Sequence, residues 1–228
     1  MKILALETTE RTGSVAVADG GNVLLEMELS HSQRSAQSLA PAMRDLLSQV
    51  GWRPDDVQLT AVSQGPGSFT GLRIGIATAK LFAYATGGEL LGIDTLAVIA
   101  DGSPDEVAEL SVVQDAQRGE LVVRRFARRS DGWFEPREPE RLLDGESWLS
   151  QLTPDQVISG PGLVRWVGRL PSQVRTLPSS CWTPRASEVA RRAAYEYDRG
   201  RRDDLWRLGP RYSRRSAAEE KWDKKAGC

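Results

Sequence analysis

The most informative segment of this 228-residue chain is GPGSFTGLRIG, residues 65–75. An apolar run, residues 59–62, precedes it, and residues 70–87 show the pattern of a helix that ends at Gly87 and Gly88. Glycines this dense between a strand and a helix predict a tight turn, and such turns often hold a phosphate group. The segment therefore leaves three alternatives: a nucleotide loop, a catalytic loop or a packing device.

The turn has a clear stereochemical basis. Gly65 and Gly67 permit backbone angles that other residues resist, and Pro66 stiffens the chain between them. Ser68 or Thr70 can cap the following helix through its hydroxyl oxygen. Because a helix start presents free backbone N–H groups, the turn is a possible anion site.

The common phosphate-binding motifs do not match this turn. A Walker A loop has Lys and then Ser or Thr after its last glycine, where this chain has Leu72 and Arg73. A G-x-G-x-x-G fingerprint also fails, because the glycine after Gly67 comes only at Gly71. The possible anion site therefore rests on the helix start alone.

Small residues recur at every fourth position of the predicted helix, at Gly71, Gly75, Ala79 and Ala83. Such a ridge lets another helix backbone approach closely. The helical pattern at residues 35–51 is the natural partner, through the apolar residues Leu39, Met43, Leu46, Leu47 and Val50. The ridge is either a tight crossing inside the protein or an interface with another molecule.

The first hundred residues follow the order βββαβαβ. The predicted strands are residues 2–9, 14–19, 22–30, 59–63 and 89–94, and the predicted helices are residues 35–51 and 70–87. Pro41 lies inside the first helical pattern, so we expect a kink or a restart there.

The second half repeats this theme more loosely. Residues 108–116 and 119–129 read as a hairpin, and residues 156–170 as a strand, a Gly-Pro-Gly turn and a helix. A last helix covers residues 183–200, with Thr183 as its N-cap and Pro184 as its first residue. We therefore expect an α/β fold of two duplicated lobes, with mixed sheets flanked by helices.

Charge is distributed unevenly along the chain. The formal net charge is only −1, but residues 1–117 carry −8 and residues 118–228 carry +7. Two lobes with differently charged surfaces, or a face toward a polyanion, would explain this asymmetry. We predict an N-terminal lobe at 1–102, a C-terminal lobe at 103–208 and a polar, basic tail at 209–228.

The chain lacks the residue clusters on which many catalytic sites depend. His31 is its single histidine, so a multi-histidine metal site is excluded and a Ser-His-Asp triad is not indicated. Cys181 and Cys228 form no Cys-x-x-Cys pair, and Asp55 and Asp56 read as a helix start or turn. We assign no catalytic residue and no metal ligand.

The N-terminus shows no signal pattern, and no apolar run approaches the 18 residues of a membrane span. We therefore expect a cytoplasmic protein that does not enter a membrane.

Four segments carry a resemblance to a known family. They are ILALETT at 3–9, VSQGPGSFTGLRIGIATAK at 62–80, DAQRGELVV at 115–123 and LGPRYSRRSAAEEK at 208–221. They resemble the bacterial TsaB (YeaZ) family, which helps make threonylcarbamoyladenosine, a modified base next to the tRNA anticodon. The resemblance implies two duplicated lobes of the actin-like ATPase (ASKHA) type, in agreement with the order of elements.

The resemblance also implies a non-catalytic subunit. The catalytic relative, TsaD, has a metal-binding His-x-x-x-His motif that a chain with only His31 cannot supply. In the family, two N-terminal helices bind TsaD, or a second copy of the chain, as a four-helix bundle. The residues carried over to this partner interface are Leu39, Met43, Leu46, Gly71, Gly75, Ala79 and Ala83.

Further partners follow from the same resemblance: a TsaE-type ATPase, and tRNA through the complex. The family usually has Asp where this chain has Glu7, and the extra methylene moves the carboxylate by about 1.5 Å. Thr8 and Thr9 are the candidate nucleotide contacts, and ATP is expected only at a partner interface. The candidates for tRNA contact are Arg211, Arg214, Arg215, Lys221, Lys224 and Lys225.

Two other functions remain open: a glycoprotease-like peptidase and a stand-alone actin-like ATPase or kinase. Specific cleavage of a partner, lost on a point mutation, would favour the first. Tight ATP binding by the isolated chain would favour the second.

Overall fold

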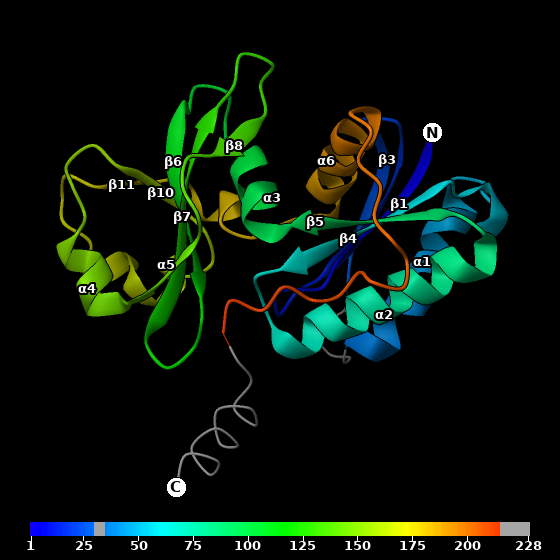
Figure 1. Ribbon diagram of the computed structural model, residues 1–228, viewed down its shortest axis with the longest axis horizontal. Coiled ribbons are helices and arrows are strands. Elements are labelled where there is room, and N and C mark those ends of the chain that lie inside the picture. Colours follow the sequence, from blue (N-terminus) through cyan, green and yellow to red (C-terminus); the bar gives the residue numbers. More distant parts are fainter. Residues whose placement is uncertain (30–34, 215–228) are drawn as a thin grey trace, which may run out of the picture.

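The computed structural model describes residues 1–29 and 35–214 of the chain. It shows two lobes, each built on a mixed β-sheet with helices against it (Figure 1). The predicted α/β architecture of two lobes is therefore confirmed.

The N-terminal lobe has a five-stranded sheet in the order β3-β2-β1-β4-β5. Its strands are β1 (Lys2–Glu7), β2 (Ser14–Asp19), β3 (Asn22–Glu28), β4 (Leu59–Gly65) and β5 (Glu89–Asp94). The first three strands are antiparallel, whereas β4 runs parallel to both β1 and β5. A short 3-10 helix, η1 (Pro54–Asp56), precedes β4, as the turn prediction for Asp55 and Asp56 requires.

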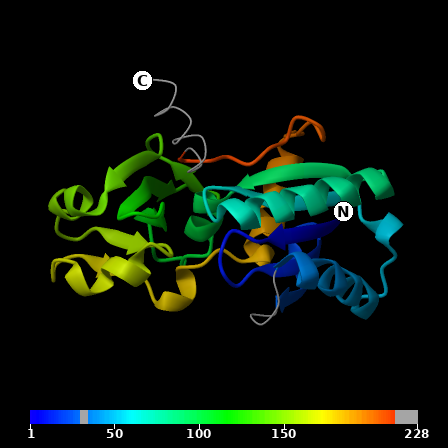
Figure 2. The ribbon, with the colours of Figure 1, turned by 90° about the horizontal axis from the view of Figure 1, so that it is seen from below.

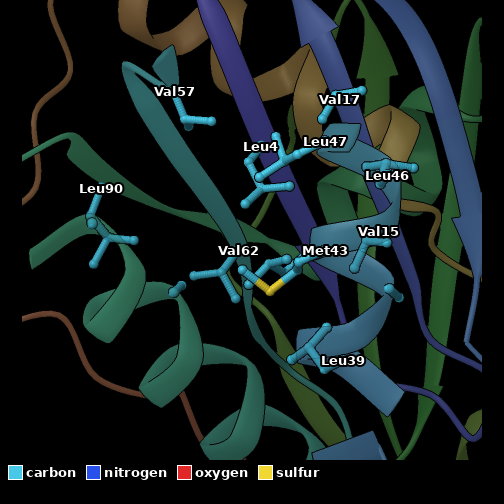
Figure 3. Close-up of a cluster of buried hydrophobic side chains, with 14 of the residues drawn as sticks. Leu4, Val15, Val17, Leu39, Met43, Leu46, Leu47, Val57, Val62 and Leu90 are labelled. Atoms are coloured by element: carbon cyan, nitrogen blue, oxygen red, sulfur yellow. The ribbon is translucent and has the colours of Figure 1, made fainter. Parts of the chain in front are cut away.

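Helices cover both faces of this sheet. The alternation of side chains along β1 sends Leu4 and Leu6 toward α1 (Ser35–Gln49) and α2 (Phe69–Thr86), on the face shown in Figure 3. Ile3 and Ala5 point to the opposite face, which α6 (Ala186–Asp198) covers. The sheet is therefore a buried layer between two layers of helix.

The C-terminal lobe repeats the same connectivity. Its sheet has the order β11-β10-β6-β7-β8, with β9 also paired to β7. Its elements are β6 (Glu109–Asp115), β7 (Glu120–Arg128), β8 (Phe134–Pro136), β9 (Arg141–Asp144), α4 (Gly145–Ser150), β10 (Val157–Ser159), α5 (Leu163–Trp166), η2 (Val167–Arg169), β11 (Arg175–Thr176) and η3 (Ser179–Cys181). The β6–β7 hairpin and the parallel set β6, β10 and β11 match β1–β2 and the parallel set β1, β4 and β5. This shared topology is the predicted duplication.

Two helix predictions involve proline residues. Helix α1 includes Pro41 without the predicted restart, and the proline ring is exposed, while a kink at Pro41 stays a prediction. Helix α6 begins at Ala186, so neither the predicted N-cap, Thr183, nor Pro184 lies in it. The first N–H groups of α6 instead find oxygen atoms of the N-terminal lobe, because Ala186 N donates to Ser14 Oγ at 2.9 Å and Ser187 N to Glu26 Oε1 at 3.0 Å.

Three segments connect or flank the two sheets. The short helix α3 (Thr95–Asp101) connects the two sheets. Helix α6 packs on β1 and β2, and the irregular segment 201–214, which we call the strap, returns along α2 (Figures 1 and 2). Among the described residues, no helix is long and apolar enough to cross a membrane.

Candidate functional site

The glycine segment forms the predicted turn between β4 and α2. Strand β4 ends at Gly65, whose φ is +121°, and α2 begins at Phe69. Ser68 is the N-cap, since its Oγ accepts a hydrogen bond from Gly71 N at 3.3 Å. Gly87 closes the helix in the left-handed conformation. The predicted turn, its serine cap and its glycine stop are confirmed.

The glycines of this turn allow a close approach of the loop after β1. A Cβ atom on Gly67 would lie within 3.0 Å of Thr9, and one on Gly71 or Gly75 would lie within 3.0 Å of Thr8. The Thr8 hydroxyl donates to Gly71 O at 2.8 Å, and Ser68 N donates to Thr9 O at 2.8 Å. The segment therefore works as a packing device in this chain.

The seven predicted interface residues lie inside the N-terminal lobe. Leu39, Met43, Leu46, Ala79 and Ala83 are at most 5% exposed and share one apolar cluster, part of which Figure 3 shows. Gly71 and Gly75 are buried against Thr8. Of the two alternatives for the ridge, the structure shows internal packing, against the β1 loop as well as α1. Whether α1 and α2 bind a partner stays a prediction, and their outward side chains would have to make the contact.

The outward face of α2 carries large apolar side chains. Leu81 is 69% exposed and Tyr84 is 64% exposed. Trp206 of the strap is 72% exposed and packs edge-on against Tyr84, with ring centroids 5.4 Å apart. Lys80 Nζ donates to Trp206 O at 3.1 Å, which fixes the strap beside the helix. We call Leu81, Tyr84 and Trp206 the outer face.

Glu7 is fully buried at the end of β1. Its carboxylate accepts hydrogen bonds from the Thr9 N–H, the Thr9 hydroxyl and the Ser63 hydroxyl. Burial raises the pKa of Glu7, against the lowering effect of those donors. The side chain therefore caps the turn after β1.

A cleft of about 1540 Å³ lies between the lobes. Residues 8–11 and 66–71 line it from the N-terminal lobe, residues 114–118 from the C-terminal lobe, and residues 212–214 from the strap. Thr8 and Thr9, the candidate nucleotide contacts, are on its wall but only 1% exposed, with both hydroxyls already bonded within the lobe. Their role toward a nucleotide stays a prediction.

Glu10 and Gln114 meet across this cleft. Gln114 Nε2 donates to Glu10 Oε1 at 2.7 Å and so joins the two lobes. Burial raises the pKa of Glu10 to about 7, and the charges of Glu7 and Asp115 act in the same direction. Gln114 is 4% exposed, and its Oε1 has no hydrogen-bond partner among the described residues. The floor of the cleft therefore offers a carboxyl group that titrates near neutral pH.

The structure also places the remaining predicted residues. Arg211 forms ion pairs with Asp94 and Glu140, and Arg214 forms one with Glu120 at 2.7 Å. His31, Arg215, Lys221, Lys224, Lys225 and Cys228 lie outside the described residues. Within residues 1–29 and 35–214, no group of His, Cys, Asp and Glu is arranged to hold a metal ion.

Sequence reasoning missed the outer face and Glu10. Leu81 and Tyr84 lie three residues apart on the helix side opposite the small-residue ridge, a spacing visible in the sequence. Trp206 stands in a charged segment and gives no periodic signal of its own. The contact of Glu10 with Gln114 spans 104 residues, so no local pattern predicts it.

The fold defines a structural class, the two-lobed α/β proteins with an ASKHA-like arrangement of two mixed sheets flanked by helices. A solved structure with a similar fold is the activator of the 2-hydroxyisocaproyl-CoA dehydratase from Clostridium difficile, with a TM-score of 0.50 and 11% identity, over 90% of this chain and 99% of that one. At that identity the likeness concerns the fold alone.

Closer relatives specify the family. The chain is 31% identical to the tRNA threonylcarbamoyladenosine biosynthesis protein TsaB of Escherichia coli, over 73% of this chain and 74% of that protein. YeaZ from Pseudomonas aeruginosa superposes with a TM-score of 0.80 at 26% identity, over 92% of this chain and 99% of the other. The sequence-family model for TsaD, tRNA N6-adenosine threonylcarbamoyltransferase, matches residues 26–131. The chain belongs to the TsaB (YeaZ) family of tRNA threonylcarbamoyladenosine biosynthesis.

Proposed function

We propose that this chain is a non-catalytic subunit that binds and activates a TsaD-type catalytic subunit. Membership of the family supports a role in threonylcarbamoyladenosine biosynthesis. The outer face is the surface that would contact the catalytic subunit. Leu81, Tyr84 and Trp206 are each more than 60% exposed, whereas Leu24 on β3, the next most exposed large apolar side chain among the described residues of this lobe, is 44% exposed. A group of exposed aromatic and aliphatic side chains is typical of a protein–protein contact.

The packing of α2 explains how this surface can work. The buried ridge holds one side of the helix against the Thr8 loop, so the opposite side is rigid before a partner arrives. A preformed surface loses little conformational freedom on binding. The resemblance to the family adds α1, which lies beside α2, so the two helices together form the docking surface (Figure 2). The same surface would pair with a second copy of the chain when no partner is present.

The remaining parts of the proposal concern the complex. A TsaE-type ATPase joins it, tRNA binds to the assembled complex, and ATP binds only at a partner interface. Arg215, Lys221, Lys224 and Lys225 come after the strap in the chain and supply positive charge for tRNA phosphates.

Reconstitution of the modification tests this function. Threonylcarbamoyladenosine is measured in tRNA after incubation with the TsaD-type and TsaE-type proteins, threonylcarbamoyl donor and ATP, with and without this chain. The proposal predicts a loss of at least tenfold in rate when the chain is omitted, and a similar loss with Leu81→Glu. Leu142→Glu is the matched control, because Leu142 is an exposed leucine on β9 in the other lobe. Equal rates with and without the chain would overturn the proposal.

A further inference from the structure

The strap is fixed to the N-terminal lobe along the edge strand β5. Gly92 N donates to Asp203 Oδ2 at 2.9 Å, and Arg201 Nη2 donates to Gly92 O at 2.6 Å. These two bonds satisfy the backbone of an edge strand that would otherwise be open on that side. Leu208 is 7% exposed and occupies the space where a Gly92 Cβ would lie. The first part of the strap is therefore a built-in element of the lobe.

The end of the strap is then positioned beside the glycine turn. Gln64 Nε2 donates to Gly209 O at 2.9 Å, and Arg211 N donates to Gln64 O at 2.8 Å. Tyr212 stacks on Phe69 with centroids 4.7 Å apart, and its hydroxyl accepts from Arg73 Nε at 2.9 Å. These contacts leave Arg211 at the boundary between the lobes.

Arg211 bridges the two lobes. Its Nη2 donates to Asp94 Oδ2 at 2.8 Å, where β5 ends and α3 begins, and to Glu140 Oε2 at 3.1 Å, in the C-terminal lobe between β8 and β9. Ser213 Oγ donates to the other oxygen of Glu140 at 3.0 Å. Arg124 of β7 also donates to Asp94 Oδ2, at 2.8 Å. The Asp94 carboxylate of the N-terminal lobe therefore accepts hydrogen bonds from an arginine of the strap and from an arginine of the C-terminal lobe.

A second set of contacts joins the lobes on the side of α6. Arg192 of α6 pairs with Asp101 of α3 and donates to Phe134 O of β8 at 2.9 Å. Figure 1 shows α6 and β8 on one side of the molecule and the end of the strap on the other. Residues 212–214 also line the cleft. If the α3–α6 side acted as a hinge, the cleft would open on the opposite side of the molecule, and the end of the strap lies there.

The Arg211 bridge is partly exposed to solvent, and one of its polar atoms has no hydrogen-bond partner among the described residues. The side chains of Arg211, Asp94 and Glu140 are 41%, 19% and 28% exposed, so water screens part of their attraction. Arg211 Nε is buried and lacks a hydrogen-bond partner within residues 1–29 and 35–214. A buried donor without a partner costs free energy, so it disfavours the arrangement in which Arg211 bridges the two lobes. Such a contact can release without unfolding either lobe.

We propose that the strap is an interlobe latch, in which Arg211 holds the C-terminal lobe closed over the cleft through Glu140. Loss of this contact leaves the Arg124–Asp94 and Gln114–Glu10 hydrogen bonds among the remaining ties described on the cleft side, so that the lobes turn more freely about the α3–α6 side and the cleft opens more often. The latch belongs to the chain alone and needs no partner.

The test measures the distance between the lobes directly. Spin labels are attached to Ser48→Cys on α1 and Ser172→Cys in the C-terminal lobe, both exposed positions, with Cys181→Ser and Cys228→Ser as background. Pulsed dipolar spectroscopy then compares the distribution of label-to-label distances in the parent, which keeps Arg211 and Glu140, with the distributions in Arg211→Gln and Glu140→Gln. Arg207→Gln is the matched control, because it removes the same charge from an exposed strap position. Thermal melting checks that each variant is folded.

The latch predicts a narrow distance distribution for the parent and for Arg207→Gln. It predicts a distribution at least twice as wide, or shifted, for Arg211→Gln and Glu140→Gln. Folded Arg211→Gln protein with the parent's narrow distribution would overturn the proposal, and so would equal broadening by Arg207→Gln.

Discussion

The chain contains the turn Gly-Pro-Gly twice, once in each lobe, and the two copies are used differently. Residues 65–67 lie at the end of β4, and residues 160–162 come after β10. Gly65 and Gly160 have φ values of +121° and +118°, and each lies against a backbone carbonyl where a Cβ would be. Both lobes therefore place a glycine with positive φ against a backbone carbonyl at this position.

The helices after the two turns differ in length. The first turn leads into the 18-residue helix α2, whereas the second leads into α5, a helix of 4 residues. The ridge of α2 lets a long helix lie close to the Thr8 loop, and its far side displays Leu81 and Tyr84. The duplication therefore supplied two equivalent positions, and only the N-terminal one carries a long helix with an exposed apolar face.

The largest effect is expected when charge enters the helix after the first turn. Ala79 is fully buried in the sheet–helix core, so Ala79→Glu should cost about 5 kcal/mol or more and unfold the chain. Val164→Glu makes a similar change in α5, at a side chain that is 75% exposed, and should leave the melting temperature within about 2 °C. Circular dichroism melts would measure both. A folded Ala79→Glu protein would show that the ridge is not internal packing.

Added volume where α2 meets the Thr8 loop is expected to have the next largest effect. A methyl group on Gly71 would meet the Thr8 carbonyl, so Gly71→Ala should cost about 3 kcal/mol. Gly168→Ala is the control in the C-terminal lobe, since nothing lies within 4 Å of its Cβ position. Urea unfolding gives the two free energies. Equal costs would mean that the close approach to Thr8 has no energetic weight.

The two turn glycines provide a more demanding comparison. Gly65→Ala and Gly160→Ala should each lower the free energy of unfolding by about 1 kcal/mol from the backbone alone, because alanine disfavours the positive φ at both positions. The carbonyl facing Gly160 belongs to Val113 in a central strand, whereas the one facing Gly65 belongs to Arg211 in the strap. Gly160→Ala should therefore be less stable than Gly65→Ala by about 1 kcal/mol or more, because the strap can shift and the strand cannot. The reverse order in urea unfolding would contradict this account.

The smallest expected effect concerns pH. The pKa of Glu10 rises from an ordinary value of 4.5 to about 7 on folding, so the folded chain keeps a proton that the unfolded chain has released. Stability should therefore fall as pH rises from about 4.5 to 7. Partial exposure limits the contribution to about 1 kcal/mol. Glu10→Gln should reduce the difference in melting temperature between pH 5 and pH 8, and an unchanged difference would exclude Glu10 as its source.

The sequence predicted correctly those parts of the molecule whose conformation depends mainly on neighbouring residues. The strand–turn–helix segment, the Ser68 cap and the Gly87 stop all follow from neighbouring residues. The spacing of small residues also predicted a close approach. It did not say what approaches, because Thr8 lies more than 60 residues away in the chain.

The failures have a common physical origin in long-range contacts. Thr183 does not cap α6 because Ser14 and Glu26, on strands β2 and β3, accept hydrogen bonds from the first N–H groups of the helix. Trp206 received no prediction from its neighbours in the sequence, and only the path of the strap places it on Tyr84. Tertiary contacts of this kind override local preference. They account for both the shifted helix start and the missed outer face.

The central claim is that the outer face of α2, and not its buried ridge, binds the catalytic partner. The most direct test is the mass of the complex with a TsaD-type subunit, measured by light scattering after size exclusion. The account predicts a 1:1 complex for the parent and for Leu142→Glu, and no complex for folded Leu81→Glu. A 1:1 complex that survives Leu81→Glu would contradict it.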